Sequence, residues 1–372
     1  MAKKNRFTVI GAGNGGKAMA AHLALKGFPV NLYNRTFSHI TAIAELGGIH
    51  LESYEGGPHG FGKMELVTSD IGEAIEDANV IMVVVPSSAH AGIARLIASH
   101  LKDGQIVILH PGRTGGAIEF KKILNDSEIA ADVIIAEAET FIYASRSEGP
   151  AEARIFRVKH AVPLAALPAT DTPAVLEALA DAYPEFVDGI DVLHTGLNNM
   201  GAIFHPALVI LNMGRIESTK GDFQFYIDGV TPSTARILGV LDRERVTVAA
   251  SMNVRARTAI EWLRFAYNVH GENLYEAIQN QTGYFGILAP NTLKHRYIFE
   301  DIPMSLVPIA SLGKRFGVSV RGIESIIRLA VILDGTDYWI RGRTIKKLGI
   351  ERLTVYELQG YVKTGVRPGS LN

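Results

Sequence analysis

The segment FTVIGAGNGGKAMAAHLALKG (residues 7–27) decides the fold of the first half of the chain. It begins with a short apolar run, passes through a glycine-rich turn, and continues as an Ala- and Leu-rich stretch that ends at Gly27. Strand, glycine turn and helix in this order are typical of the first βαβ unit of a dinucleotide-binding domain. In such a unit Gly11 permits the tight turn, Gly13 lets the backbone approach a pyrophosphate, and Gly16 allows close helix–strand packing. The alternative is a glycine-rich turn without a ligand.

Strand-like and helical segments continue to alternate after this unit. Apolar runs predict further strands at Val30–Tyr33, Val80–Val85, Ile106–Leu109 and Val133–Ala136. The run at residues 80–85, VIMVVV, is apolar without a break, which is typical of a strand buried on both faces of a parallel sheet. The alternation predicts an α/β Rossmann fold with a doubly wound, mostly parallel sheet.

From about residue 191 the pattern changes to helical periodicity with few strand-like runs. Long helical segments are predicted at Met200–Arg215, Pro232–Val240, Val246–Tyr267 and Leu312–Asp334. A chain of 372 residues is long enough for two domains. We therefore predict a Rossmann domain over residues 1–190, an all-α second domain over residues 191–362, and a disordered tail over residues 363–372, where Gly, Pro and Ser occur without periodicity.

The composition excludes several classes of protein. The net charge is -1, from 37 Lys and Arg against 38 Asp and Glu, whereas nucleic-acid binders usually carry a basic excess. Cysteine is absent, so disulfides, thiolate metal sites and a cysteine nucleophile are excluded, and we expect no metal. No apolar run is long enough for a signal peptide or a membrane span. We expect a cytoplasmic enzyme without membrane or nucleic-acid partners, and a homodimer, because a helical second domain often carries a dimer interface.

The end of the second predicted strand favours one nicotinamide cofactor over the other. NAD enzymes usually place Asp or Glu there to bind the ribose 2′-hydroxyl, whereas this chain has Asn34 and Arg35. No carboxylate repels a 2′-phosphate, and the Arg35 guanidinium can pair with one, so NADP is predicted, with NAD as the alternative. Arg35 can also be a solvated surface charge. The predicted cofactor-binding residues are Gly11, Gly13, Asn14, Gly16, Asn34, Arg35, Val85 and Pro86.

Polar residues follow the later strands at their carboxyl ends, the edge where ligands bind in open α/β sheets. His110 and Arg113 lie in the loop HPGRTGG after the strand at Ile106–Leu109, and Thr140 follows the next strand. Hydroxyl and guanidinium groups there can hold a small acid beside the nicotinamide. The alternative for each is loop chemistry, because Pro and Gly shape turns and Thr caps helices.

Two residues of the second half are candidates for proton transfer. His205 lies among apolar residues in TGLNNMGAIFHPA (residues 195–207), and Asp301 is surrounded by Ile302, Pro303 and Leu306. A buried carboxylate is usually paired, and a pair of these two would form a dyad that keeps a general acid charged near neutral pH. Hydride transfer needs such a group, because the cofactor delivers no proton. The alternative for His205 is an ordinary core or surface histidine.

At these residues the sequence resembles the octopine/nopaline-type opine dehydrogenases over essentially the whole chain. The matching segments are GAGNGG, HPGRTGGAIEF, AEAETFIYASRSEGP, VPLAALPA, LNNMGAIFHPA and HRYIFEDIPMSLVPI. Six matches in order are far more specific than any one of them. Two departures are Met304-Ser305, where family members commonly carry Tyr-Gly, and Asn34-Arg35 in place of the Asp of NAD-using relatives.

The resemblance implies the reaction and its residues. An α-amino acid condenses with an α-keto acid, often pyruvate, and NAD(P)H reduces the imine to a secondary-amine dicarboxylate. The family's catalytic His and Asp match His205 and Asp301, and its substrates bind in the cleft between the domains. Two substrate carboxylates need cationic or donor partners, for which His110, Arg113, Thr140 and Arg296 are the candidates, although Arg296 can instead touch the cofactor phosphates.

Two other functions remain open from the sequence. One is a keto-acid reductase resembling ketopantoate reductase or the β-hydroxyacid dehydrogenases. Those enzymes place a catalytic Lys early in the second domain, whereas no Lys occurs here from Thr195 to Thr219. The other is a non-catalytic NADPH-binding regulator, because fold alone never establishes activity.

Overall fold

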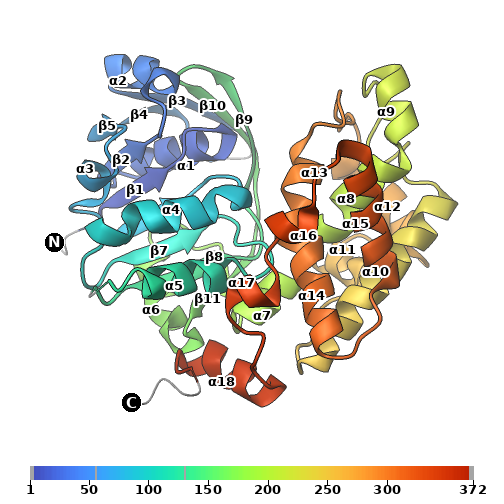
Figure 1. Ribbon diagram of the computed structural model, residues 1–372. Coiled ribbons are helices and arrows are strands. Elements are labelled where there is room, and N and C mark those ends of the chain that lie inside the picture. The colour runs from blue at the N-terminus through green and yellow to red at the C-terminus, as the bar shows by residue number, and fades with distance from the viewer. Residues whose placement is uncertain (1–3, 55–56, 130, 368–372) are drawn as a thin grey trace. The chain divides into compact units, whose positions relative to one another are not determined.

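The computed structural model describes residues 4–54, 57–129 and 131–367, and the chain forms two compact units (Figure 1). The first comprises the chain up to Thr195 together with the residues from Gly360 onward, and the second comprises Gly196–Gln359. The change of unit thus falls five residues after the predicted boundary at 190/191. Residues 360–362, assigned to the helical domain from the sequence, belong to the first unit.

The first unit contains the predicted mostly parallel sheet. It has eight strands, in the order β12 (Phe186–Asp188), β11 (Val162–Leu167), β8 (Ile134–Ala138), β7 (Ile106–Leu109), β6 (Val80–Val83), β1 (Phe7–Ile10), β2 (Val30–Tyr33) and β5 (Leu66–Thr68). All neighbours are parallel except β8 and β11. The chain builds outward from β1 to β2 and β5, then returns to add β6, β7 and β8 on the other side. This reversal beside β1 is where doubly wound sheets bind ligands.

Helices connect the strands of this unit. They are α1 (Asn14–Leu25), α2 (Thr41–Leu46), α3 (Ile71–Ile75), α4 (His90–Ile97), α5 (Gly116–Asp126) and α6 (Thr172–Leu179), with 3-10 turns at Phe37–His39, Ser87–Ala89, Ala98–His100 and Ala169–Asp171. Helix α7 (Val192–Leu197) follows the last strand, and the chain passes from one unit to the other within α7 and again within α18 (Val355–Thr364). Helix α3 begins with an acidic cap, because the Asp70 side chain accepts a hydrogen bond from the Glu73 N–H. All four residues of each of β1, β2, β6 and β7 are buried, which explains the continuous apolar sequences of β6 and β7. The two buried polar residues, Thr8 of β1 and Asn31 of β2, both donate a hydrogen bond to the Ala74 carbonyl.

A second sheet in this unit was not predicted. Its four strands follow the order β4 (Gly60–Lys63), β3 (Gly48–Ser53), β10 (Glu152–Val158) and β9 (Tyr143–Gly149). Helix α1 contacts strands of both sheets, and a Cβ at Gly62 of β4 would lie 2.8 Å from the backbone of Ala21 in α1. This close approach lets the small sheet cover the outer side of the helix that follows the glycine turn.

The second unit is helical, as predicted. Its helices are α8 (Gly201–Leu211), α9 (Met213–Thr219), α10 (Pro232–Ser251), α11 (Ala259–Tyr267), α12 (Leu274–Gln279), α13 (Arg296–Phe299), α14 (Val307–Arg315), α15 (Arg321–Asp334), α16 (Tyr338–Arg341) and α17 (Ile345–Leu348), with a 3-10 turn at Thr282–Tyr284 and a π-helical turn at Ile302–Leu306. Residues 196–359 are all described and contain no strand, only an isolated bridge between Gln224 and Leu288.

Several predicted helix boundaries in this unit were wrong. The segment Met200–Arg215 is two helices that meet at Asn212, where the backbone leaves helical geometry. The segment Val246–Tyr267 is interrupted after Ser251, because Asn253 adopts a left-handed φ of 59°. The segment Leu312–Asp334 breaks near Gly317, whose φ is 73°. Left-handed residues of this kind terminate helices, and they left no gap in the apolar periodicity.

The predicted tail begins too early. Helix α18 extends to Thr364, so residues 363 and 364 are helical, and residues 368–372 lie outside the described residues. Across the described ranges, no helix is both long and apolar enough to cross a bilayer.

Candidate active site

The glycine turn between β1 and α1 has the geometry that a dinucleotide requires. Gly11 has a φ of 110°, and a Cβ there would lie 2.4 Å from the Val84 carbonyl oxygen at the end of β6. A Cβ at Gly16 would lie 1.7 Å from the Gly11 carbonyl oxygen. At Gly13 a Cβ would meet nothing within 4 Å. Two glycines therefore serve packing within the turn, while Gly13 leaves open space at the start of α1, where helix N–H groups favour a phosphate.

Asn34 and Arg35, two predicted cofactor residues at the end of β2, have different surroundings. The Asn34 Oδ1 accepts a hydrogen bond of 3.3 Å from the Ala12 N–H, and its Nδ2 donates to the Thr36 carbonyl at 2.9 Å. Asn34 therefore supports the glycine turn itself. Arg35 is exposed, and no hydrogen bond or ion pair to its guanidinium is found in the part of the chain that the structure describes. Its charge is available to a ligand at this strand end.

Asn14, Val85 and Pro86 also lie at this edge of the sheet. The Asn14 side chain accepts a hydrogen bond of 3.0 Å from the Ser147 N–H in β9, which links the start of α1 to the small sheet. Val85 lies against the turn, because a Cβ at Gly11 would meet its Cγ1 at 2.8 Å. Pro86 is exposed. The residues present therefore fit a nicotinamide dinucleotide at the carboxyl ends of β1 and β6.

His110, a predicted substrate residue, is 2% exposed. Its ring packs against Phe186 with the centroids 5.7 Å apart, and within the described ranges neither ring nitrogen has a hydrogen-bond partner. Burial lowers the pKa of His110 to about 3, so its ring is neutral. In the structure His110 is therefore a buried residue that packs against Phe186. The sequence did not distinguish this role from ligand binding.

Arg113 and Thr140 are accompanied by a residue that the sequence analysis missed, Lys159. The Lys159 Nζ donates to the Thr140 Oγ1 at 2.7 Å and to the Phe141 carbonyl at 2.9 Å. Burial lowers the pKa of Lys159 to about 8; Glu139 opposes this shift and Arg113 adds to it, so both lie within electrostatic reach. A single lysine after a strand carries no local signal, and only the packing of β10 brings it to Thr140.

Glu137, the other missed residue, is fully buried in β8. Its Oε2 accepts a hydrogen bond of 2.7 Å from the Ala117 N–H in the first turn of α5, and its Oε1 accepts one of 2.7 Å from the Thr195 hydroxyl. A carboxylate at a helix N-terminus is stabilised by the helix dipole. Glu137 therefore holds together β8, the start of α5 and Thr195, after which the chain enters the second unit.

The second unit pairs the two residues predicted as a dyad. The His205 Nδ1 on α8 lies 2.8 Å from the Asp301 Oδ2, a contact between residues 96 positions apart in the chain. The Asp301 side chain is completely buried, whereas that of His205 is 19% exposed. No hydrogen bond to the His205 Nε2 comes from the described residues, so this nitrogen is available for proton transfer. In such a pair the carboxylate orients the ring and stabilises its charged form.

Aromatic rings support the dyad. Tyr297 on α13 stacks on His205 with the centroids 4.0 Å apart and the planes 19° apart, and it also stacks with Phe225 at 5.4 Å. His295 contacts Tyr297 edge-on at 4.4 Å. Burial, followed by the charge of Arg296, lowers the pKa of His295. These aromatic contacts join segments far apart in the chain, so spacing alone does not reveal them.

Arg296 and Ser305 complete the surroundings of Asp301. The Arg296 Nε lies 3.0 Å from the buried Glu300 Oε2, and half of its side chain is exposed. The Asn199 Nδ2 donates to the Ser305 Oγ at 2.8 Å, so the serine that departs from the family pattern has a bonding role beside the dyad. Among the residues described, no group of three or more His, Cys, Asp or Glu is placed to hold a metal ion.

Another His–Asp pair shows why distance alone does not identify the dyad. The His194 Nδ1 lies 2.9 Å from the Asp191 Oδ1, but the two residues are only three positions apart. The same Asp191 oxygen accepts the backbone N–H groups of Leu193 and His194 at the start of α7. This pair is a local helix cap, whereas His205 and Asp301 are brought together by the fold of the helical unit.

Comparison with known proteins places this geometry in a family. The model of the NAD/NADP octopine/nopaline dehydrogenase alpha-helical domain matches residues 189–333, and that of the NAD-dependent glycerol-3-phosphate dehydrogenase N-terminus matches residues 6–138. An opine dehydrogenase of Arthrobacter sp. (strain 1C) is 38% identical over 363 residues, which are 98% of this chain and 100% of the relative. The chain belongs to the opine dehydrogenase family. As a member it is an NAD(P)H-dependent oxidoreductase, which confirms the predicted resemblance, enzyme class and nicotinamide cofactor.

More distant opine dehydrogenases share the sequence or the fold. Octopine dehydrogenase of Pecten maximus is 24% identical over 307 residues, 75% of each chain. A solved structure of octopine dehydrogenase in complex with NADH and agmatine has a TM-score of 0.81 at 21% identity, covering 98% of this chain and 99% of that one. A ketopantoate reductase of Ralstonia eutropha JMP134 has a lower TM-score of 0.62 at 16% identity, covering 89% and 98%. The rival reductases thus share the architecture, and the family's helical domain separates them from this chain.

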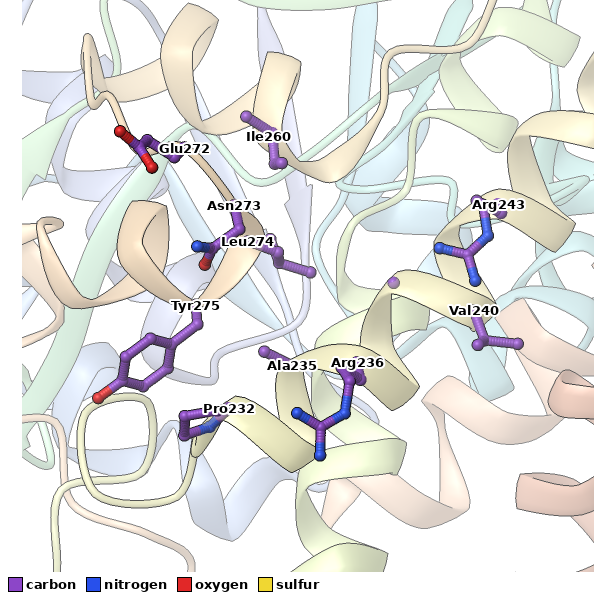
Figure 2. A pocket seen from close by; sticks show the side chains of 11 residues that line it. Pro232, Ala235, Arg236, Val240, Arg243, Ile260, Glu272, Asn273, Leu274 and Tyr275 are labelled. Atoms are coloured by element: carbon purple, nitrogen blue, oxygen red, sulfur yellow. The ribbon is translucent and has the colours of Figure 1, made fainter.

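A pocket of about 860 Å³ in the helical unit lies apart from the predicted site residues (Figure 2). Residues of α10, α11 and α12 line it, and Arg236 and Arg243 lie on its α10 side. None of the residues predicted for substrate or cofactor is among its lining residues. The family assignment therefore attaches no role to it.

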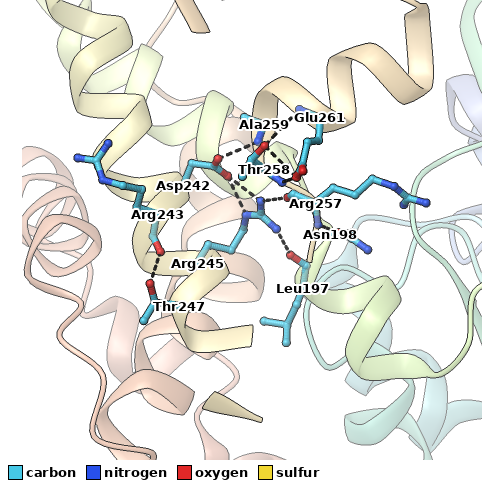
Figure 3. Close-up of polar contacts among 10 residues, drawn as sticks. All are labelled: Leu197, Asn198, Asp242, Arg243, Arg245, Thr247, Arg257, Thr258, Ala259 and Glu261. Atoms are coloured by element: carbon cyan, nitrogen blue, oxygen red, sulfur yellow. Dashed lines mark hydrogen bonds and ion pairs between the residues drawn. The ribbon is translucent and has the colours of Figure 1, made fainter. Parts of the chain in front are cut away.

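A buried arginine stabilises the start of the helical unit in this family member (Figure 3). Arg245 on α10 is fully buried and bonds to the Asp242 Oδ1 at 2.6 Å, and its other donors reach the carbonyls of Leu197 and Arg257. The second oxygen of Asp242 accepts the Ala259 N–H at 2.7 Å. One ion pair thus ties the chain before α8 to α10 and to the start of α11.

Proposed function

We propose that this opine dehydrogenase condenses an α-amino acid with an α-keto acid, pyruvate foremost, and reduces the imine to an N-(1-carboxyalkyl) amino acid. The observation that carries the proposal is the His205–Asp301 pair in a member of this family whose glycine turn fits a dinucleotide. Solved octopine dehydrogenase structures described as complexes with NADH and L-arginine, and with NADH and pyruvate, support the two substrate classes.

His205 manages the protons of the condensation. Its neutral Nε2 takes a proton from the amino acid's ammonium group, and the free amine attacks the keto carbon to form a carbinolamine. The resulting imidazolium then returns the proton to the hydroxyl group, which leaves as water when the C–O bond breaks and the iminium forms. Asp301, bonded to Nδ1, keeps the proton-transfer nitrogen at Nε2 and stabilises the charged ring during this cycle.

The bound cofactor supplies the hydride that reduces the iminium carbon, and it is oxidised to NAD(P)+. Overall, an N–C bond and a C–H bond form at the keto carbon, its C=O bond is broken and the oxygen leaves as water, and the product is a secondary amine. We propose that Arg113, Thr140 and Arg296 hold the substrate carboxylates. Thr140 is suited to donate a hydrogen bond to a substrate carboxylate. Its Oγ1 already accepts a hydrogen bond from Lys159, so its hydroxyl proton can be directed to another acceptor.

We propose NADP as the preferred cofactor. Arg35 supports this choice because it is exposed at the end of β2, where no carboxylate opposes a 2′-phosphate. NAD remains the alternative cofactor, since Asn34 is neutral and repels neither form.

The test is oxidation of NADPH, followed by absorbance, in the presence of pyruvate and a panel of amino acids. We expect oxidation only when both substrates are present, with the N-(1-carboxyethyl) amino acid detected by mass spectrometry. Oxidation with pyruvate alone would instead support a keto-acid reductase, and no oxidation with a broad panel would support a regulator.

The matched variants are His205→Ala and His194→Ala, because both remove a histidine paired with an aspartate. We expect the first to cut turnover without weakening NADPH binding and the second to leave turnover nearly unchanged. Equal activities of the two variants would contradict the assignment of His205.

A further inference from the structure

The His205 ring is contacted from two directions by one short segment of the chain. Asp301 meets it in the ring plane, 2.8 Å from Nδ1, and Tyr297 covers its face with a centroid distance of 4.0 Å. The two contacting residues are four positions apart, around the end of α13. A ring held by its edge and by its face has little freedom to rotate, so its Nε2 points in one direction.

Tyr297 is itself held in place. Its ring is nearly parallel to that of Phe225, at 5.4 Å and 23°. Phe225 is fully buried, and its N–H donates to the Ile287 carbonyl at 2.7 Å. His295 also contacts the Tyr297 ring, edge-on and with the centroids 4.4 Å apart. The stack is therefore anchored in the core of the helical unit.

We propose that Tyr297 is a positioning residue of the reaction, whose ring face both orients the His205 imidazole and stabilises its protonated form. The inference rests on the proposed function, in which His205 must alternate between neutral and charged forms. The face of an aromatic ring carries negative electrostatic potential, so a cation stacked on it is stabilised. Since the His205 side chain is only 19% exposed, solvent weakens this effect only in part.

Other charged groups around His205 act in both directions. The Asp301 carboxylate, 2.8 Å from Nδ1, attracts a positive charge on the ring, whereas a charged His295 repels one, because the charges of the two histidines interact. Glu300 offsets Arg296 through their ion pair. On α10, which packs against α8, Asp242 and Arg245 neutralise each other. Substitutions at Tyr297 leave all of these charges in place, so their effect reports the aromatic ring.

The experiment compares Tyr297→Phe, which keeps the ring, with Tyr297→Leu, which removes it. NMR titration of the His205 ring protons, assigned with a His205→Asn variant, reports the ring without reliance on turnover. We expect the ring in Tyr297→Leu to titrate about half a pH unit lower, the size of a cation–π contact at a partly exposed site, and in Tyr297→Phe to titrate as in the original chain. The alkaline limb of the kcat profile should move by the same amount.

Tyr284→Leu is the matched control, because Tyr284 stacks on Tyr226 at 4.3 Å and 20° without touching His205. We expect it to leave the His205 titration unchanged. Tyr297→Met carries the same expectation as the Leu variant and replaces it in the test if the Leu variant does not fold. An unaltered titration in both the Leu and Met variants, or a Phe variant shifted as far as they are, would overturn the proposal. Because the titration needs no substrate, absence of opine synthesis would refute the proposed function separately.

Discussion

Replacing Asp301 by Asn is the sharpest test of the dyad, because it removes the charge beside Nδ1 of His205 and keeps the size and shape of the side chain. The Asp301 side chain is completely buried and its Oδ2 lies 2.8 Å from Nδ1. An amide of the same shape can accept a neutral hydrogen bond from the ring, but it cannot stabilise an imidazolium. If its NH2 group faces Nδ1 instead, the ring must carry its proton on Nε2, which is the wrong tautomer for accepting one.

The size of the effect follows from the bond that is weakened. A hydrogen bond to a charged group contributes about 1.5–3 kcal/mol, and about 1.4 kcal/mol corresponds to a factor of ten in rate. We therefore expect kcat for reductive condensation to fall by roughly 10- to 150-fold. The Kd for NADPH should be unchanged, because the glycine turn and Arg35 belong to the other unit.

The assay is initial-rate NADPH oxidation at saturating pyruvate and amino acid, with NADPH binding measured by fluorescence. Asp191→Asn, which alters the local cap at His194, is the matched control and should retain activity. A kcat within a factor of two of the original would refute the charge-stabilising role. So would a variant with both His205→Asn and Asp301→Asn whose loss equals the product of the two single losses, because residues that act as a unit are not additive.

Three further predictions address the cofactor, the helical unit and pH. Arg35→Ser should weaken NADPH binding by about ten-fold or more while NADH binding changes little, which parallel fluorescence titrations would show; equal loss for both cofactors would contradict the 2′-phosphate assignment. Arg245→Met should lower the free energy of unfolding by about 3–5 kcal/mol in urea denaturation because it leaves Asp242 buried without its partner, and adding Asp242→Leu should recover part of the loss. Burial lowers the pKa of His22 from 6.5 to about 3, so between these pH values the unfolded chain binds a proton at this histidine and the folded chain does not. The free energy of unfolding therefore falls as the pH drops below 6.5, by about 1.4 kcal/mol per pH unit for this group. His22→Leu should reduce the fall of the urea midpoint between pH 7 and 5, to which the buried His110 also contributes, and an unchanged slope would refute this cause.

The Rossmann unit was predictable where its signals are local. The apolar run predicted to open the segment 7–27 and the predicted strands at Val30–Tyr33 and Ile106–Leu109 coincide with β1, β2 and β7, because central parallel strands are largely apolar. The small sheet escaped prediction for the opposite reason. Three of the four residues of β4 are exposed, and it contains two glycines, so its sequence has neither an apolar run nor clear alternation.

The candidate site divides in the same way. The glycine turn was predictable because all of its glycines lie within a few consecutive residues between a strand and a helix. His205 and Asp301 were singled out as polar residues in apolar segments, and the family resemblance supplied their pairing. Lys159 and Tyr297 were not predicted, because only a contact with a residue distant in sequence marks them as part of the site. Lys159 contacts Thr140, and Tyr297 contacts His205.

Short-range sequence was therefore sufficient for the fold class, the glycine turn and the helical second half, since steric limits on glycine and the periods of helices and strands act within about ten residues. The tertiary structure alone decided that His110 is buried, that Asn34 supports the turn while Arg35 faces solvent, and that a tyrosine stacks on the dyad histidine. Burial and side-chain contact depend on how elements pack, and the two residues of the dyad are 96 positions apart. No local pattern encodes a contact over that distance, so it exists only in the folded chain.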